Sequence, residues 1–126
     1  MARETIAPPD GPKPSGSYSP GVRAGDFVFV SGQGPVDPAT GKMAGDDIRS
    51  QVQQVLRNVE SILQATGLTL DDVVRIDAYL ADLNDFDAYD EAYRAFFPAN
   101  PPARTTVQSG LLGIKVEINA VAYRPR

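Results

Sequence analysis

The apolar residues of the chain form two helical stripes. Over residues 46–66 they recur with a period of about 3.6 residues, which predicts an amphipathic helix that Gly67 closes at its C-terminal end. A second stripe, mostly aromatic, begins at Phe86, with Asn84 as the expected N-cap and Pro98 as the residue that stops the helix. Each predicted helix therefore has one face available for a hydrophobic core.

Four further runs have the composition of strands. Residues 26–32 are β-branched and aromatic on both faces, so this strand is expected to be buried on two sides. Residues 73–80 alternate and form a strand with one apolar face. That apolar face holds Val74, Ile76, Ala78 and Leu80. Two final strands, at about residues 104–109 and 115–123, flank a turn at residues 110–113. One face of the last strand holds Val116, Ile118, Ala120 and Ala122.

The N-terminal region reads as an extended arm over residues 1–15, because its prolines lack the amide donor that a continuous strand needs. A strand at about residues 16–22 should follow and pair through a hairpin at Ala24 and Gly25. The predicted architecture is α+β, a mixed sheet with two helices on one face, in one domain of residues 1–126. Since the strand at residues 26–32 is apolar on both sides, another copy of the chain is the simplest cover for the second side.

Composition restricts the chemistry. The chain has no cysteine and no histidine, which excludes disulfides, thiolate nucleophiles, Ser-His-Asp and Cys-His arrangements, and nearly every ordinary zinc site. We therefore expect no metal and no cofactor. The net charge is −4 and the basic residues do not cluster, so a nucleic-acid partner is disfavoured. No apolar run approaches the roughly 18 residues that a membrane span needs, and we expect a soluble, cytoplasmic protein.

Arg104 and Glu117 are the candidate chemical groups. Arg104 opens a strand, and Glu117 faces away from the apolar stripe of the last strand, toward the surface that a second copy would cover. Each also has a plain interpretation, as a structural ion pair or a solvated carboxylate. Ser31 could equally bond to backbone at a strand end, and Tyr18 could be a packing residue. The residues alone leave the function open.

Several segments together resemble the Rid proteins, also called the YjgF or L-PSP family, in order over nearly the whole chain. These segments are residues 16–21 with Tyr18, 30–35, 37–38, 40–41, 51–58, 67–68, 82–86, Tyr93, 96–97, 102–107 and 115–118. The most specific are Pro-Ala-Arg-Thr-Thr-Val and Val-Glu-Ile, in combination with Ser-Gly-Gln.

The resemblance implies a chorismate-mutase-like fold of the Bacillus type in a barrel-like homotrimer, with sites in the clefts between subunits. It implies hydrolysis of reactive 2-imino or enamine acids to 2-keto acids and ammonia. Arg104 would bind the substrate carboxylate and Glu117 would position the attacking water. Residues lining the pocket would be Tyr18, Ser31, Gly32 and Thr106.

Three features depart from the best-known members of that family. Thr106 stands where many have cysteine, Asn119 replaces a frequent glutamate, and the connection at residues 110–113 is shorter by about two residues. These changes leave the substrate side chain open. The alternatives are a non-catalytic trimer that binds small carboxylates or proteins, a specialised enamine hydrolase of one pathway, and an endoribonuclease, which the acidic charge and lack of histidine weaken.

Overall fold

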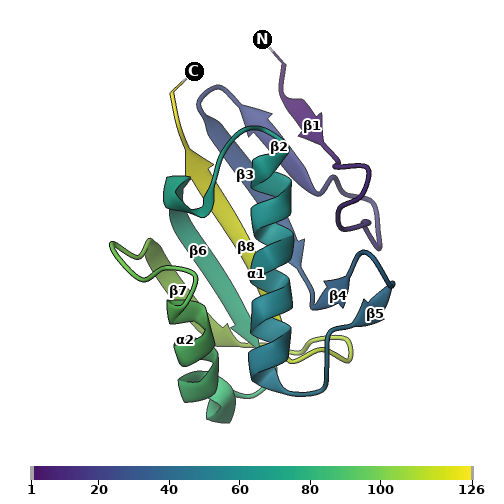
Figure 1. Ribbon diagram of the computed structural model, residues 1–126, viewed down its shortest axis with the longest axis vertical. Coiled ribbons are helices and arrows are strands. Elements are labelled where there is room, and N and C mark those ends of the chain that lie inside the picture. The colour runs from purple at the N-terminus through teal and green to yellow at the C-terminus, as the bar shows by residue number, and fades with distance from the viewer. Residues whose placement is uncertain (1, 126) are drawn as a thin grey trace.

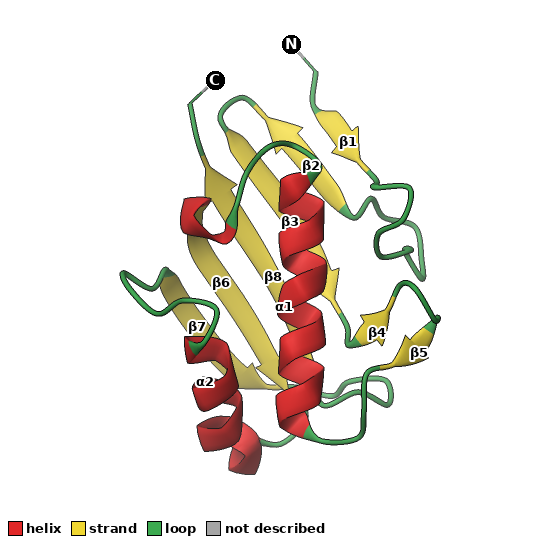
Figure 2. Ribbon diagram, viewed as in Figure 1, coloured by secondary structure: helices red, strands yellow, loops and turns green. Residues whose placement is uncertain are grey.

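The computed structural model describes residues 2–125 and shows a six-stranded sheet with two helices on one face (Figures 1 and 2). The strands of the sheet are β1 (Glu4–Ile6), β2 (Gly21–Ala24), β3 (Phe27–Gln33), β6 (Val73–Leu80), β7 (Ala103–Gln108) and β8 (Val116–Tyr123). The other elements are α1 (Ile48–Gln64), α2 (Phe86–Arg94), two 3-10 turns (Leu70–Asp72 and Leu83–Asp85) and a separate hairpin of β4 (Val36–Asp37) and β5 (Lys42–Met43). The predicted α+β architecture is confirmed.

The C-terminal strand lies inside the sheet, whose order is β1-β2-β3-β8-β6-β7 (Figure 1). β6 and β7 are parallel, and the other neighbouring strands are antiparallel. A parallel pair needs a crossover connection, and α2 provides it between β6 and β7. The last two strands are therefore not neighbours, although they follow one another in the sequence, because β6 lies between them.

Helix α1 has the apolar stripe that its sequence predicts, and the structure adds an N-cap that was not predicted. Its N-cap is Asp47, whose Oδ2 accepts the backbone N–H of Ser50 at 2.9 Å. Gly67 follows the helix with a φ of +81°, in the left-handed region that favours glycine. The fully buried apolar residues of the helix are Val52, Val55, Leu56, Val59, Ile62 and Leu63. Neither α1 nor any other described helix is long and apolar enough to cross a membrane.

The face of the sheet away from the helices carries large apolar side chains that residues 2–125 leave uncovered. In β3, Val28 and Val30 belong to the core, whereas Phe27 and Phe29 on the other face are 41% and 46% exposed. The ring of Phe27 packs on Tyr123 of β8, with 5.0 Å between centroids. Strand β3 is therefore apolar on both faces, as predicted, and we call the uncovered side the open face.

Two local predictions are wrong. Val74 was expected on the apolar face of β6, but it is 45% exposed and Val73 is buried instead. The pairing of β6 with β8 shifts between Val73 and Arg75, and this irregularity changes the alternation by one residue. Asn84 is not the N-cap of α2, because a 3-10 turn precedes the helix and Asp82 accepts the Asn84 N–H at 2.8 Å.

The N-terminal region contains a strand that its proline content obscures. Strand β1 pairs antiparallel with β2 before the prolines begin, and this strand was not predicted. The strand expected at residues 16–22 starts only at Gly21 and runs to Ala24. The hairpin at Ala24 and Gly25 is confirmed, and Gly25 adopts a φ of +59° in the turn between β2 and β3.

Candidate active site

The two predicted catalytic side chains lie on opposite faces of the sheet. Arg104 is opposite Ile76 in the parallel pair of β6 and β7, and Ile76 is buried under the helices. Glu117 lies between Val116 and Ile118 of β8, which are both buried on the helix side. Because side chains alternate along a strand, Glu117 points to the open face and Arg104 points toward α2.

Glu117 lines a cavity of about 760 Å³, which we call the Glu117 cavity. Its walls come from the N-terminal arm, the loop after β3, the end of β6 and the turn before β8. Tyr18 and Gly32, two further residues predicted for the site, line the same cavity. Among the described residues that line it, Lys13 is the one cation, and its Nζ donates to the carbonyl oxygen of Pro9 at 2.6 Å.

Gly32 allows the Glu117 carboxylate to lie directly against β3. The pairing of β3 with β8 shifts between Val30 and Gln33, so Ser31 and Gly32 form an irregular, bulge-like step beside Glu117. A Cβ on Gly32 would lie 2.5 Å from Oε2 of Glu117, well inside van der Waals contact. Glycine at position 32 therefore allows this position of the carboxylate, which a side chain there would displace.

Ser31 fastens the N-terminal arm to the sheet. Its hydroxyl donates to the carbonyl oxygen of Ser19 at 2.6 Å, and its backbone N–H donates to that of Pro20 at 2.9 Å. Both bonds fix the segment that carries Tyr18, whose hydroxyl accepts the backbone N–H of Ser15 at 3.1 Å. Ser31 is not among the described residues that line the cavity, so its role in substrate binding stays a prediction.

Buried amide side chains of α1 hold the loops around the cavity, and the sequence analysis gave them no role. Asn58 donates to the carbonyl oxygens of Gly34 and Val36, at 3.1 and 2.9 Å. Its own Oδ1 accepts a hydrogen bond from Nε2 of Gln54 at 2.9 Å. The loop that forms one wall of the Glu117 cavity is thus bonded to the core rather than free.

Gln51 bonds two other loops to helix α1. Its Oε1 accepts the backbone N–H of Lys115 at 2.8 Å, and its Nε2 donates to the carbonyl oxygen of Gly45 at 2.9 Å. The sequence indicates that these amides are buried. Gln51, Gln54 and Asn58 are spaced by three and four residues along the apolar stripe of the helix. Polar residues at buried helical positions need partners, and these partners are the loops of the site.

Replacing Asn58 by alanine is expected to lower the free energy of unfolding by about 2–4 kcal/mol. Two loop carbonyl groups would lose their donor and Gln54 would lose its acceptor. Urea denaturation measures the change. The matched control is Gln53→Ala on the exposed side of the same helix, which should change stability by less than about 0.5 kcal/mol. Equal effects of both substitutions would contradict the role of Asn58.

Arg104 packs on the aromatic side of α2. Its guanidinium carbon lies 4.6 Å from the ring centroid of Tyr93, 5.1 Å from Tyr89 and 5.7 Å from Phe86. Its Nη1 is 2.8 Å from Oδ1 of Asp90, and the arginine side chain is 21% exposed. A second cavity, of about 320 Å³, is lined by Arg104 together with Asp90 and Tyr93.

The phenols beneath Arg104 are neutral near pH 7. Burial raises the pKa of Tyr93 to about 12 and also raises the pKa of Tyr89. The hydroxyl groups of Tyr89 and Thr106 lie 2.7 Å apart and share a hydrogen bond. Thr106 therefore faces α2 and does not line the Glu117 cavity. Its contact with substrate stays a prediction.

Arg104 and Glu117 of one chain are too far apart to share one small substrate. Glu117 is opposite Tyr79, which is opposite Val107, and Arg104 precedes Val107 on the same strand. Strand geometry gives roughly 14 Å between the Cα atoms of Arg104 and Glu117. In a 2-imino acid the carboxylate is bonded to the reacting carbon. A site that uses both side chains therefore needs two copies of the chain.

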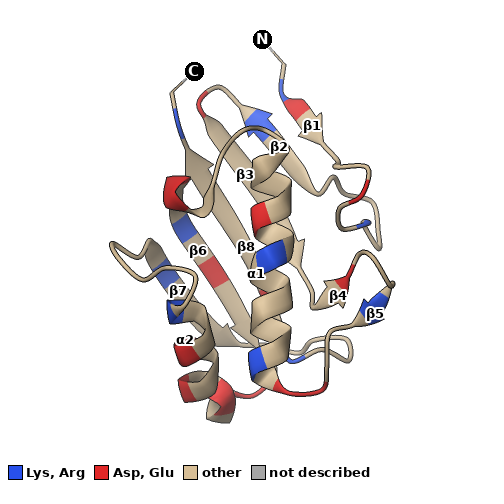
Figure 3. Ribbon diagram, in the orientation of Figure 1, with Lys and Arg blue, Asp and Glu red and all other residues tan. Residues whose placement is uncertain are grey.

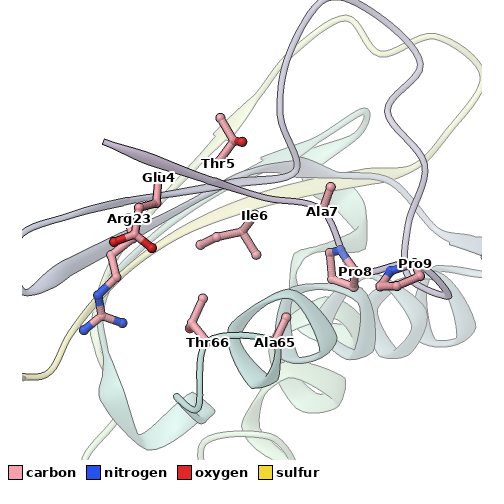
Figure 4. A pocket seen from close by; sticks show the side chains of 9 residues that line it. All are labelled: Glu4, Thr5, Ile6, Ala7, Pro8, Pro9, Arg23, Ala65 and Thr66. Atoms are coloured by element: carbon pink, nitrogen blue, oxygen red, sulfur yellow. The ribbon is translucent and has the colours of Figure 1, made fainter. Parts of the chain in front are cut away.

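Another cavity, of about 590 Å³, lies between β1, the following prolines and the end of α1 (Figure 4). Glu4 and Arg23 lie at one end of it, and Pro8 and Pro9 at the other. Arg23 is buried, and its Nε donates to the carbonyl oxygen of Gly25 at 3.3 Å. None of the predicted site residues lines this cavity. Nor do residues 2–125 include a group of three or more His, Cys, Asp or Glu that could hold a metal ion.

Comparisons with known sequences agree over the whole fold. The family model described as Endoribonuclease L-PSP matches residues 9–124. A 2-iminobutanoate/2-iminopropanoate deaminase of Salmonella typhimurium is 42% identical, in a match covering 96% of this chain and 98% of that protein. A RutC family protein of Pyrococcus horikoshii is also 42% identical, over 97% of this chain and 98% of its own length.

Solved structures show the same architecture. The Escherichia coli YjgF gene product superposes with a TM-score of 0.91 at 40% identity, covering 96% of this chain and 98% of that one. Escherichia coli TdcF with bound serine gives a TM-score of 0.91 at 38% identity, with the same coverage. The match therefore includes the arm, the sheet and both strands of the candidate site. The chain belongs to the L-PSP family, the YjgF or Rid family that its sequence resembles, and has the chorismate-mutase-like fold of that family.

Proposed function

We propose that this protein hydrolyses 2-imino and enamine acids to 2-keto acids and ammonia, in clefts between the copies of a homotrimer. The observation that carries the proposal is the carboxylate of Glu117, which lines a cavity together with Tyr18 and Gly32. Similarity to the 2-iminobutanoate/2-iminopropanoate deaminases of Salmonella typhimurium and Escherichia coli, at 42% and 40% identity, supports this activity.

In this proposal a neighbouring copy supplies Arg104. A cleft that combines Arg104 from one copy with Glu117 from the next brings two different surfaces together, and such heterologous contacts form a ring when the rotation between copies closes. The open face supports association, because Phe27, Phe29 and Tyr123 leave apolar area exposed in the single chain. A homotrimer is the ring that the family resemblance implies.

The binding residues fall into two groups. Arg104 would hold the substrate carboxylate, since a planar guanidinium can donate two parallel hydrogen bonds to its two oxygens. Thr106 lies on the same face of β7 as Arg104. Tyr18 and Gly32 would bound the reacting end beside Glu117. Ser31 would act by holding the arm that carries Tyr18.

The chemistry requires only water and side chains. The carbon of a protonated imine is electrophilic, so water can add to it while Glu117 accepts a proton from that water. The product is a carbinolamine, whose nitrogen takes up the proton. The carbon–nitrogen bond then breaks as the hydroxyl group loses its proton, which releases ammonia and leaves the 2-keto acid. Holding the carboxylate and the water in place supplies much of the rate enhancement.

An imine-trapping assay tests the activity. An amino-acid oxidase generates 2-imino acids from several amino acids, and semicarbazide traps what survives. The wild-type protein should suppress the trapped product. Arg104→Ala should lower the rate of imine hydrolysis by at least about 100-fold, so that the trapped product is no longer suppressed. The matched control is Lys13→Ala, which removes the cation of the Glu117 cavity. If Lys13→Ala loses activity and Arg104→Ala keeps it, the assignment of the carboxylate site to Arg104 is wrong.

The same preparation tests assembly. Size-exclusion chromatography with light scattering should give three times the chain mass of 13.5 kDa. A monomer that still hydrolyses imines would overturn the two-copy site, because the two side chains cannot meet within one chain. A trimer without activity on any imine would favour the carboxylate-binding alternative.

The family description also names endoribonuclease activity. Figure 3 shows the basic residues interspersed with acidic ones over the strands, α1 and the loops, rather than gathered in one stripe. The net charge is −4 and the chain has no histidine for general acid–base cleavage of RNA. These features support imine hydrolysis over RNA cleavage. Incubation with labelled RNA should leave the RNA intact.

A further inference from the structure

Asp90 of α2 lies between two arginines, one of which is Arg104. Its Oδ1 is 2.8 Å from Nη1 of Arg104, and its Oδ2 is 3.1 Å from Nη2 of Arg94. We propose that Asp90 is a built-in competitor that lowers the affinity of Arg104 for the substrate carboxylate and thereby sets the KM of the enzyme. The inference rests on the proposed function, in which Arg104 binds that carboxylate.

Aromatic rings hold the guanidinium of Arg104 in addition to Asp90. Tyr93, Tyr89 and Phe86 all have ring centroids within 5.7 Å of the guanidinium carbon of Arg104. Tyr89 is itself fixed, because it is fully buried and its hydroxyl bonds to Thr106. Removing the charge of Asp90 therefore leaves Arg104 on the same surface. The main change is in the electrostatic potential that an incoming carboxylate meets.

Asp90 opposes a carboxylate in either way that Arg104 can bind it. A ligand that bonds to the two terminal nitrogens must displace Asp90 from Nη1. A ligand that bonds to Nε and Nη2 leaves Asp90 in place, but its charge then lies about 5 Å from that of Asp90 on the same guanidinium. At an effective dielectric constant of about 50, between the values for a protein surface and for water, this repulsion weakens binding by about tenfold.

The competition has a use in turnover. The 2-keto acid product carries the same carboxylate as the substrate, so an arginine with no competitor would hold both tightly. The carboxylate is also unchanged in the transition state, and binding that is equally strong in substrate and transition state lowers KM without raising kcat. Asp90 weakens this shared binding of the carboxylate. Arg94 limits the weakening, because it pairs with Asp90 and partly neutralises its negative charge. The consequence is faster release of the product.

The test is Asp90→Asn, which keeps an oxygen beside Arg104 and removes the charge. Calorimetry with 2-oxobutanoate at low ionic strength should show a Kd about tenfold lower than wild type, and imine KM should fall similarly without a rise in kcat. The matched control is Glu91→Gln on the same helix. Glu91 pairs with Arg49 of α1 at 3.0 Å. Its substitution therefore removes the same charge from the helix without removing a contact to Arg104. Its Kd should stay within about twofold of wild type.

Two further variants identify the cause. Asp90→Glu keeps the charge and should bring Kd back toward the wild-type value. Asp90→Asn combined with Arg104→Ala should bind no better than Arg104→Ala alone, because Asp90 acts through that arginine. Thermal unfolding of each variant separates these effects from simple destabilisation.

The outcomes distinguish this inference from the proposed function. If the wild type binds 2-oxobutanoate and hydrolyses imines while Asp90→Asn matches Glu91→Gln or binds more weakly, Asp90 is not a competitor and the proposed function stands. If Arg104→Ala binds and reacts as well as wild type, the carboxylate role of Arg104 fails, and the role of Asp90 fails with it.

Discussion

An equimolar mixture of Arg104→Ala and Glu117→Gln chains, assembled together, should recover about one quarter of the wild-type imine hydrolysis. Each variant alone should lose at least about 100-fold in kcat/KM, which is typical for the loss of a positioning or general-base residue. Arg104 and Glu117 lie on opposite faces of the sheet of one chain, so in the proposed function each site takes one residue from each of two copies. Random assembly places two intact residues together in about one site of four.

Co-expression of the two chains with different affinity tags allows the measurement. Before separation the mixture should show the quarter recovery, and trimers that carry both tags should have about one intact site in three. The control pairs Arg104→Ala with a chain that carries both substitutions, where no site has both residues and no recovery is expected. Absence of recovery in the doubly tagged trimers would show that the two residues act within one chain or not together.

Gly32→Ala should lower kcat about 100-fold with little change in stability. The new Cβ would lie 2.5 Å from Oε2 and 2.9 Å from Cδ of Glu117, so the carboxylate must move. The obstacle is the end of a flexible side chain that faces a cavity, and its rotation costs the fold little. In the proposed reaction catalysis depends on where Glu117 holds water, and a displacement of about 1 Å is enough to cost this factor.

Gly16→Ala is the matched control for Gly32→Ala. A Cβ there would lie 3.7 Å from the ring of Tyr18, an ordinary contact, and no positive φ is needed. This variant should keep kcat within about twofold of wild type. Urea denaturation of both variants checks that neither unfolds. Full activity in Gly32→Ala would mean that the observed position of the Glu117 carboxylate does not matter for the reaction.

The long periodic segments were predictable from the sequence. Helix α1 has a complete apolar stripe, a capping aspartate and a terminal glycine, and these local signals agree with the fold. The inward positions of β8 are buried as their alternation predicts. Alternation also placed Glu117 on the open face, because its two neighbours belong to the core.

Features that depend on strand pairing were not predictable. Val73 is buried and Val74 is exposed because the pairing of β6 with β8 is irregular at this point. Nothing in the sequence of the two valines indicates this irregularity. The face of Arg104 depends on its pairing with Ile76, in a parallel pair formed through the α2 crossover. The stacking of Arg104 on Tyr93, and its bond to Asp90, follow from that register.

The hydrogen bond from the Lys115 amide to Gln51 connects the rim of the Glu117 cavity to a helix of the core. Amides in surface loops usually exchange with solvent when the loop alone opens. This amide must break its bond to a fully buried side chain of α1 before it can exchange, and the bonds of Asn58 to Gly34 and Val36 hold another wall of the cavity to the same helix. Slow hydrogen exchange at Lys115 would therefore report cooperative opening of the helix rather than motion of the loop, and the cavity keeps its shape for as long as α1 stays docked.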